Sequence, residues 1–162
     1  MEILIRTYRP EDENPFKQSI AQLQEYERGF GIDMLPGDEM ADAWFRYTIE
    51  ETKQKGGEIY VAEVDNRAVG FMSLRVEPSS AEEDLYCKPA TSVFVYDLHI
   101  SPGFRGNGIG KRLLSKADEY AVKRNIPYIK LQVFAGNTHG RAVYQALGYQ
   151  EVAVTMVKQI TD

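Results

Sequence analysis

The sequence predicts one mixed α/β (α+β) domain, and three observations support this class. The chain has 162 residues, of which 43% are hydrophobic and 27% charged, which suits a single domain with a core of its own. Short alternating or apolar segments, typical of strands, are interspersed with longer segments of helical periodicity. No repeat, low-complexity segment or linker interrupts the chain. We therefore expect one domain over residues 1–162.

The first half is predicted to hold a strand, two helices and a hairpin. Residues 2–8 alternate apolar and polar side chains, as a strand does, and a helix is expected from Pro10 to about Arg28. Its apolar face would carry Phe16, Ile20, Leu23 and either Tyr26 or Glu27. A second helix is expected between residues 36 and 55, followed by two strands at residues 58–64 and 68–76 that a tight turn joins.

The second half is predicted to alternate strands and helices after a long loop at residues 77–92. Residues 93–100 form an almost wholly apolar strand, and residues 109–124 carry a strong apolar stripe typical of a helix. Another buried strand is expected at residues 128–134 and a short helix at about 138–147. Residues 149–159 alternate again, and we expect them to close the sheet as its last strand.

Charge is divided unevenly along the chain. Residues 1–87 hold 19 acidic and 9 basic side chains, a net charge of −10, whereas residues 88–162 hold 5 acidic and 10 basic, a net charge of +5. The division reflects either ordinary solvated faces or a basic half for an anionic ligand and an acidic half for a cationic one. In the second case Glu82, Glu83 and Asp84 would lie near the entrance for the cation. A pI near 5.2 without a dense basic stripe argues against nucleic acid.

Three further features bear on the compartment and on metals. The first residues lack the basic start and the apolar run of a signal peptide, and no segment approaches the roughly 20 apolar residues of a membrane span. Cys87 is the only cysteine, so an internal disulfide is excluded, and a cytoplasmic protein is expected. No group of His, Cys and carboxylate residues has metal-ligand spacing, so no metal is expected.

A glycine-rich turn predicts a site for phosphate. The turn Arg105–Gly110 reads RGNGIG and joins the apolar strand to the amphipathic helix. Helix N-termini carry unpaired N–H groups and a partial positive charge, and glycine lets the backbone approach an anion closely. Lys111 and Arg112 add positive charge beside the turn. Together these features form a phosphate cradle.

The spacing of the turn separates three kinds of cradle. A Walker A loop fails, because Arg105 and Arg112 stand where its first glycine and its Ser or Thr belong. A dinucleotide fingerprint fails, because Lys111 stands at its last glycine. The pattern that fits is Arg/Gln-x-x-Gly-x-Gly/Ala, at Arg105, Gly108 and Gly110.

A second motif lies downstream. The segment NTHGRAVYQALGY, which begins at Asn137, is similar to the pattern Asn-x-x-Ala-x-x-x-Tyr-x-x-x-Gly-Phe/Tyr. Asn137, Tyr144, Gly148 and Tyr149 match it in register, and Gly140 stands where alanine or serine is usual. The two patterns, at the expected separation, resemble the two signatures of the GNAT N-acetyltransferase family. The order of the predicted elements matches that family over nearly the whole chain.

The resemblance implies a GNAT fold, with a mixed, mostly antiparallel sheet of about six or seven strands flanked by about four helices. It also implies acetyl-CoA as co-substrate. The strands at residues 93–100 and 128–134 would splay apart, and the pantetheine arm would lie in that gap. The cofactor-binding residues that the resemblance implies are Leu98, His99, Ile100, Arg105, Gly106, Asn107, Gly108, Ile109, Gly110, Lys111, Asn137 and Tyr144.

Acetylation of an amine needs an uncharged amine, a polarised thioester carbonyl and a proton for the leaving thiolate. By the resemblance, Tyr144 is the acid. The base is left open: Tyr96 replaces the family's usual Glu, and Asp97 matches an acid that some members carry. On a regular strand, Asp97 and His99 would point to one face, and Tyr96 and Leu98 to the other. Asp97 is either a base or a buried partner for polar groups, and His99 is either a base or relay or a core histidine.

Alternative functions remain in view. A thiol enzyme built on Cys87, His99 and Asp97 is disfavoured, because Cys87 falls in a loop without a helix N-terminus. The favoured function is direct transfer of acetyl from acetyl-CoA to a small, cationic amine such as a polyamine, aminosugar or aminoglycoside. The alternatives are a peptide or protein amine as acceptor, and a non-catalytic module that binds acetyl-CoA. A homodimer is common in the family, and neither nucleic acid nor membrane is expected as a partner.

Overall fold

A five-stranded sheet forms the centre of the protein. The computed structural model describes residues 1–160, so residues 161–162 of the expected domain lie outside it. The strands lie in the order β1-β2-β3-β4-β5; each neighbouring pair is antiparallel except the parallel pair β4 and β5. This confirms the predicted mixed, mostly antiparallel sheet, with five strands in the place of six or seven. The strands are β1 (Leu4–Thr7), β2 (Glu58–Val64), β3 (Arg67–Pro78), β4 (Thr91–Ile100) and β5 (Tyr128–Leu131).

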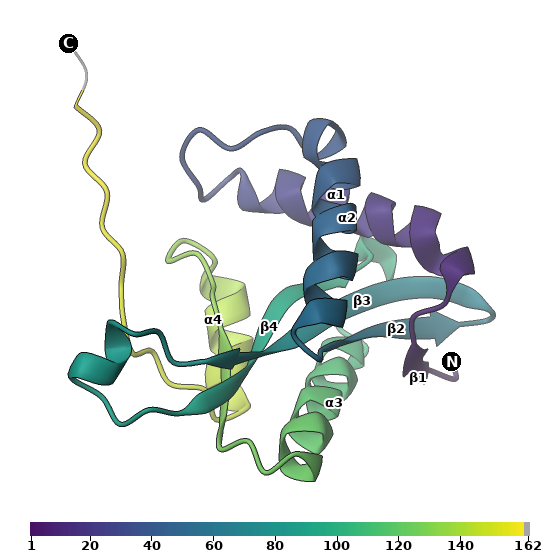
Figure 1. Ribbon diagram of the computed structural model, residues 1–162. Coiled ribbons are helices and arrows are strands. Elements are labelled where there is room, and N and C mark those ends of the chain that lie inside the picture. Colours follow the sequence, from purple (N-terminus) through teal and green to yellow (C-terminus); the bar gives the residue numbers. More distant parts are fainter. Residues whose placement is uncertain (161–162) are drawn as a thin grey trace.

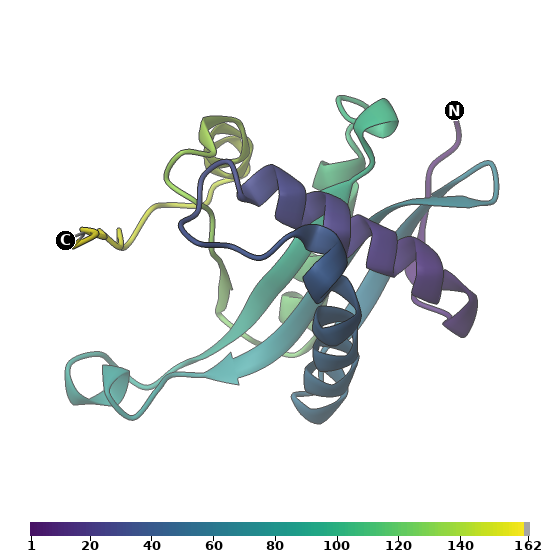
Figure 2. The ribbon, with the colours of Figure 1, turned by 90° about the horizontal axis from the view of Figure 1, so that it is seen from above.

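Four helices surround the sheet, as predicted. Helices α1 (Glu13–Glu27) and α2 (Gly37–Gln54) cover one face, and α3 (Ile109–Lys123) covers the other (Figure 1). Seen from above, α1 crosses over the strands (Figure 2). Helix α4 (Thr138–Ala146) follows β5 and lies beside that end of the sheet. Short 3-10 turns at residues 10–12, 83–85 and 102–104 complete the elements.

Each face of the sheet has its own apolar core. On one face, the stripe predicted for α3 packs against inward residues of β2, β3 and β4. On the other face, Phe16 and Ile20 of α1 and Phe45 of α2 pack against β2 and β3. The rings of Phe16 and Phe71 are stacked with their centroids 4.8 Å apart. Burial of such apolar stripes holds amphipathic helices on a sheet, so this packing fixes the orientation of α1 and α3.

An ion-pair cluster fixes the beginning of α1. Asp12, only 4% exposed, accepts hydrogen bonds from the Arg6 guanidinium at 2.7 and 2.9 Å and from the backbone N–H of Arg9 at 2.8 Å. Arg6 also donates to Glu63 at 2.7 Å. These contacts join β1, β2 and the turn that begins α1, so the helix is anchored at its N-terminal end.

The C-terminal strand is the part of the fold that the prediction got wrong. Residues 150–160 have no regular secondary structure, and Figure 1 shows them leading away from the sheet. Their apolar side chains are exposed, with Val152 at 95%. Strand β5 is also shorter than the predicted segment, because it ends at Leu131. Alternation in the sequence indicates a possible apolar face. A strand also needs the edge of a neighbouring strand to pair with, and β5 itself pairs over only four residues.

Candidate active site

Strand β4 has an open edge next to the glycine-rich turn. Its parallel pairing with β5 ends at Val95 and Leu131. Beyond that point β4 continues to Ile100 with only β3 beside it in the sheet. The edge that β5 leaves uncovered includes Leu98–Ile100, the residues expected to bind the pantetheine arm. Unpaired backbone groups on a strand edge can pair with the amides of an extended ligand.

A bulge in β4 changes which side chains face α1 and α2. Ser73 pairs with Asp97 and Leu74 with Val95, so Tyr96 is the extra residue. The Tyr96 hydroxyl donates to Glu77 at 2.7 Å, and its ring lies 3.2 Å from the Arg75 guanidinium, which pairs with α2. The expectation that Tyr96 points away from Asp97 is therefore wrong. The bulge breaks the strict alternation of a regular strand, and both side chains face the helices.

Asp97 is buried in a network of donors. Its Oδ1 accepts from Trp44 Nε1 of α2 at 2.8 Å, and its Oδ2 accepts from Ser73 at 2.5 Å and from Thr48 at 3.5 Å. Asp97 is 5% exposed, and burial raises the pKa of its carboxyl although the three hydrogen bonds act to lower it. Both oxygens thus already have partners, which is how a buried carboxylate is normally satisfied.

His99 lies two residues further along β4 and contacts α1. Its Nδ1 is 2.7 Å from Ser19 Oγ of α1, and its Nε2 is 3.4 Å from Arg105 Nη2. Arginine can only donate, so Nε2 accepts and Nδ1–H donates to Ser19. Burial, followed by the charge of Arg105, lowers the pKa of His99 to about 4. The imidazole is therefore neutral at pH 7.

The glycine-rich turn has the geometry of an anion cradle. Gly108 caps α3 with φ of +75°, and Gly106 has φ of +78°, a left-handed conformation that favours glycine. A Cβ added at Gly106, Gly108 or Gly110 would meet no atom within 4 Å, so the backbone of the turn is open to a ligand. The first N–H groups of α3 have no partner within a helix and point out of its N-terminus. The predicted cradle residues 106–111 are thus brought together at the end of β4.

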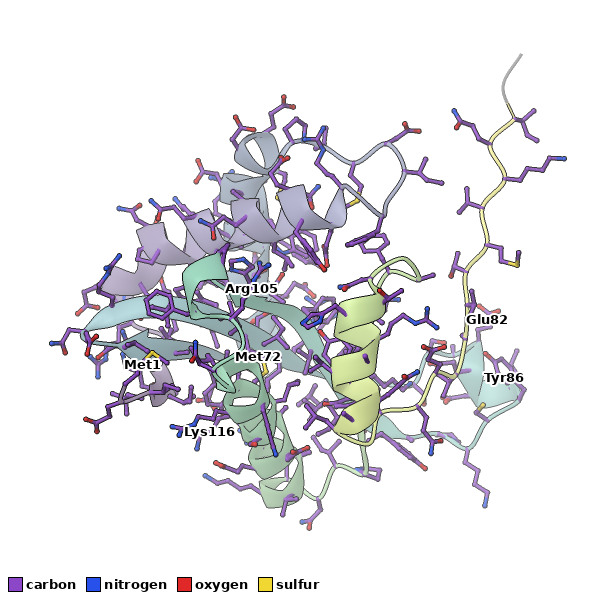
Figure 3. The ribbon with its side chains drawn as sticks, turned by 180° about the vertical axis from the view of Figure 1, so that it is seen from behind. Met1, Met72, Glu82, Tyr86, Arg105 and Lys116 are labelled. Atoms are coloured by element: carbon purple, nitrogen blue, oxygen red, sulfur yellow. The ribbon has the colours of Figure 1, made fainter. Side chains whose placement is uncertain are left out.

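Two predicted cofactor residues have side chains engaged elsewhere. Arg105 donates from Nε to the carbonyl of Ile100 at 2.9 Å and lies 5.5 Å from the ring centroid of Tyr26. Figure 3 shows Arg105 between α1 and the start of α3. The Asn107 amide donates to the carbonyls of Phe104 and Arg105 at 3.2 Å and so shapes the turn. The backbone N–H of Arg105 also donates, to the Pro102 carbonyl at 3.3 Å. Of these two residues, only Asn107 therefore has a backbone N–H without a partner among residues 1–160.

The second motif places Asn137 and Tyr144 on α4. Asn137 is the N-cap of α4: its Oδ1 accepts from the Gly140 N–H at 2.9 Å and from the Tyr26 hydroxyl at 3.1 Å. Tyr144 packs edge-on against Tyr149, with ring centroids 5.9 Å apart. Burial, and then the charge of Glu27, raises the pKa of Tyr144 to about 12. Among residues 1–160, no hydrogen-bond partner contacts its hydroxyl.

Glu27 is a carboxylate of this region that the sequence did not single out as a site residue. It lies on the last turn of α1, half-buried, and burial followed by the charge of Asp97 raises its pKa to about 7. The available signal was its spacing, because Glu27 follows Leu23 by four residues on the apolar face of the predicted helix. Because Tyr26 was an equally good candidate for that face, the spacing did not single out Glu27.

The acidic loop and Cys87 lie on the β3–β4 hairpin. Figure 3 shows Glu82 and Tyr86 at its tip, at one edge of the molecule and well away from Arg105. Glu83 pairs with Lys130 of β5 at 3.5 Å. Cys87 is exposed on this hairpin, so the structure does not bring it to His99 and Asp97. Within residues 1–160, no three His, Cys, Asp or Glu side chains gather in a group that could hold a metal ion. No helix in that range is long and apolar enough to cross a membrane.

Comparisons with known proteins agree on one family. The model of the acetyltransferase (GNAT) family matches residues 20–149. An uncharacterized N-acetyltransferase of Methanocaldococcus jannaschii is 30% identical over 138 residues, covering 82% of this chain and 58% of that protein. N-alpha-acetyltransferase 40 of Saccharomyces cerevisiae is 32% identical over 117 residues, covering 65% and 41%. The chain spans about half the length of the curated relatives it matches.

The fold also matches solved structures. An aminoglycoside N-acetyltransferase in complex with CoA superposes with a TM-score of 0.74 at 19% identity, covering 98% of this chain and 95% of that one. At this identity the match establishes the fold, and what the two proteins bind or acetylate has to be argued from the residues.

Proposed function

This chain belongs to the GNAT acetyltransferase family, and from that premise we propose that it transfers the acetyl group of acetyl-CoA to the amine of a small acceptor. The observation that carries the proposal is the open glycine cradle at the start of α3, which directly follows the uncovered edge of β4. A phosphate group on the cradle and an extended amide arm on the strand edge are the two parts of CoA that these features suit.

The residues present fit the cofactor. The backbone N–H groups of residues 108–111 would hold the pyrophosphate, with Lys111 and Arg112 exposed beside them. The backbone of Leu98–Ile100 would pair with the pantetheine amides. Acetyl-CoA would then supply the activated acyl group, and the chain's own residues would orient it and move the protons.

Two proton transfers are required. The amine nitrogen attacks the thioester carbonyl carbon, the carbon–sulfur bond breaks, and the leaving sulfur needs a proton. In our proposal Tyr144 donates it, because a phenol with a pKa of about 12 stays protonated at pH 7. Asp97 and His99, predicted as base candidates, are buried behind hydrogen-bond partners. In our proposal they fix β4 against α1 and α2, and any part they take in proton transfer is limited to a relay.

The acceptor we propose is a small cation. The support is the acidic first half of the chain and the half-buried carboxyl group of Glu27 on the last turn of α1. Similarity to N-alpha-acetyltransferase 40 favours a peptide amine as the second candidate. A non-catalytic acetyl-CoA-binding module is the third, and turnover alone separates it from the other two.

An amine panel tests the function. The purified chain is incubated with acetyl-CoA and, in turn, a polyamine, an aminoglycoside, a diamino acid, a peptide with a free N-terminus and a neutral amine, while free thiol is measured. We expect the highest kcat/KM with a small polycation. If the peptide gave the highest kcat/KM, the result would favour the second candidate, a peptide amine. Acetyl-CoA binding without turnover on any amine would contradict enzymatic activity.

Replacement of Tyr144 by phenylalanine is expected to lower kcat by about 10- to 100-fold. General-acid assistance is typically worth about 10²–10⁴-fold, and a thiolate with an unperturbed pKa of about 8.5 is a good leaving group, so the effect should fall near the lower end. Affinity for acetyl-CoA should stay unchanged because the ring remains. The measurement is kcat beside calorimetric affinity and melting temperature.

Tyr149→Phe is the matched control. Its ring neighbours Tyr144, burial likewise raises the pKa of its hydroxyl to about 12, and that hydroxyl is buried without a hydrogen-bond partner among the described residues. Its removal should leave kcat at the parental value. Parental kcat in Tyr144→Phe would leave Tyr144 as a packing residue only.

A further inference from the structure

The last turns of α1 bridge the two sides of the candidate site. Ser19 of α1 contacts His99 of β4 at 2.7 Å, and Tyr26 donates to Asn137, the N-cap of α4, at 3.1 Å. Just past the helix, the ring of Phe30 lies against Gly136, where an added Cβ would approach it to 2.9 Å. Helix α1 is therefore anchored to β4 in its middle and to the start of α4 at its C-terminal end.

Glu27 lies on the inward face of α1, at this bridging end. It follows Ile20, which is 4% exposed, by seven residues and Leu23 by four, so the three share one helix face. Leu23 lines a small cavity with Asp97 and His99. Glu27 thus extends the buried stripe by one turn beyond the apolar core, toward the open edge of β4 and toward α4.

The carboxyl group of Glu27 has no partner of opposite charge. Among residues 1–160, no basic side chain pairs with it and no donor hydrogen-bonds to it. The titratable groups whose charges couple to it are Asp97 from β4 and Tyr144 from α4. Two cations near this end of α1 are engaged elsewhere: Arg28 pairs with Glu25, and Arg105 contacts the Ile100 carbonyl, His99 and the ring of Tyr26.

This position is costly for a carboxylate. Burial and the neighbouring Asp97 both disfavour its charge, which raises the pKa of Glu27 to about 7. The C-terminal end of a helix is also the negative end of its dipole. Glu25, two residues earlier, shows the contrast: it accepts a hydrogen bond from the Gly37 N–H at 2.6 Å and pairs with Arg28, and these contacts lower its pKa. A cationic ligand would relieve the unfavourable environment of Glu27.

We propose that Glu27 is the general base of the acetyl transfer and the residue that receives the acceptor's ammonium group. This assignment rests on the proposed function and identifies a base on α1, where the sequence had indicated one on β4. Glu27 accepts a proton from the ammonium, and the freed lone pair forms the bond to the carbonyl carbon as the carbon–sulfur bond breaks. Of the two protons that the nitrogen loses, one leaves through Glu27 to water. The other replaces the proton that Tyr144 gives to sulfur.

The test is the pH profile of Glu27→Gln, with the best amine of the panel as acceptor. For the parent, kcat/KM should fall as pH drops below about 7, because the base must be ionised to accept a proton. For the variant, kcat/KM at pH 7 should be lower by about 10²–10³-fold. In place of the parental acid limb near pH 7, kcat/KM of the variant should rise about tenfold per pH unit up to the pKa of the amine itself. The reason is that without the base only the free amine reacts. Glu27→Asp should recover part of the activity and the acid limb.

The matched control is Glu25→Gln, on the same turn of α1. Glutamine keeps an oxygen that can accept from the Gly37 N–H, so the parental pH profile is expected. Calorimetry should give both Gln variants the parental affinity for acetyl-CoA. A Glu27→Gln variant that retains parental kcat/KM and the acid limb overturns this assignment while leaving the acetyltransferase in place. A parent without turnover on any amine overturns the proposed function, and the assignment with it.

Discussion

Acetyl-CoA binding is expected to be lost when Gly108 is replaced by glutamate. The new carboxylate would stand at the N-terminus of α3, where the pyrophosphate is expected to meet the first N–H groups of the helix. Two like charges 4 Å apart repel by about 4 kcal/mol at an effective dielectric constant of 20, which corresponds to about a 10³-fold loss of affinity. A Cβ at this position would meet no atom within 4 Å, so the cost to folding should be limited to the strain of a non-glycine residue at φ +75°, and the chain should still fold. Calorimetric titration with acetyl-CoA measures the effect.

Gly56→Glu is the control that separates the two effects of Gly108→Glu, which are the added charge at the cradle and the backbone strain. Gly56 also has a positive φ, +61°, and a Cβ there would meet no atom within 4 Å. Its carbonyl accepts a hydrogen bond from Tyr120, twelve residues after Gly108, or about 18 Å along α3. This variant should lose the same stability as Gly108→Glu but bind acetyl-CoA normally. Parental affinity in a folded Gly108→Glu protein would remove the turn from cofactor binding.

Much of the fold could be predicted because its signals are local. The apolar stripe that begins at Ile109, and the glycines before it, define a strand–turn–helix unit without reference to the rest of the chain. The same holds for α4, which was predicted at about residues 138–147 and spans Thr138–Ala146. The strand expected at residues 149–159 shows the limit, since alternation says nothing about whether a partner edge is available.

The predicted site was less complete because its groups meet over long separations in sequence. Asp97 is satisfied by Trp44, Thr48 and Ser73, at least 24 residues away. The bulge that turns Tyr96 toward α2 depends on the register with β3, which no local pattern in β4 reveals. Glu27 owes its altered pKa to burial and to Asp97, seventy residues away in the chain. From the sequence alone, a buried carboxylate on a helix cannot be distinguished from one on a solvent-exposed face.

The role of Asp97 in the fold can be measured separately from catalysis. Asp97→Ala would leave the indole N–H of Trp44 and the hydroxyl of Ser73 buried without their acceptor. Each such loss costs about 1–3 kcal/mol, so we expect a total near 3 kcal/mol. Asp97→Asn keeps one carbonyl oxygen and should cost only about 1 kcal/mol. The free energy of unfolding in urea measures both, and Asp118→Ala, an exposed aspartate on α3, should change it by less than about 0.5 kcal/mol.

The difference in unfolding free energy between the parent and Asp97→Asn should depend on pH with a definite sign. Burial raises the pKa of Asp97 in the folded protein above the value of about 3.9 in the unfolded chain. Between those two values the folded state binds more protons than the unfolded state, so the stability from Asp97 falls as pH rises through that window. Asparagine does not titrate, so the advantage of the parent over Asp97→Asn should grow as pH is lowered from 8 toward 4. A difference that stays constant or shrinks toward low pH would contradict a raised pKa. Parental stability in Asp97→Ala would contradict the hydrogen-bond network itself.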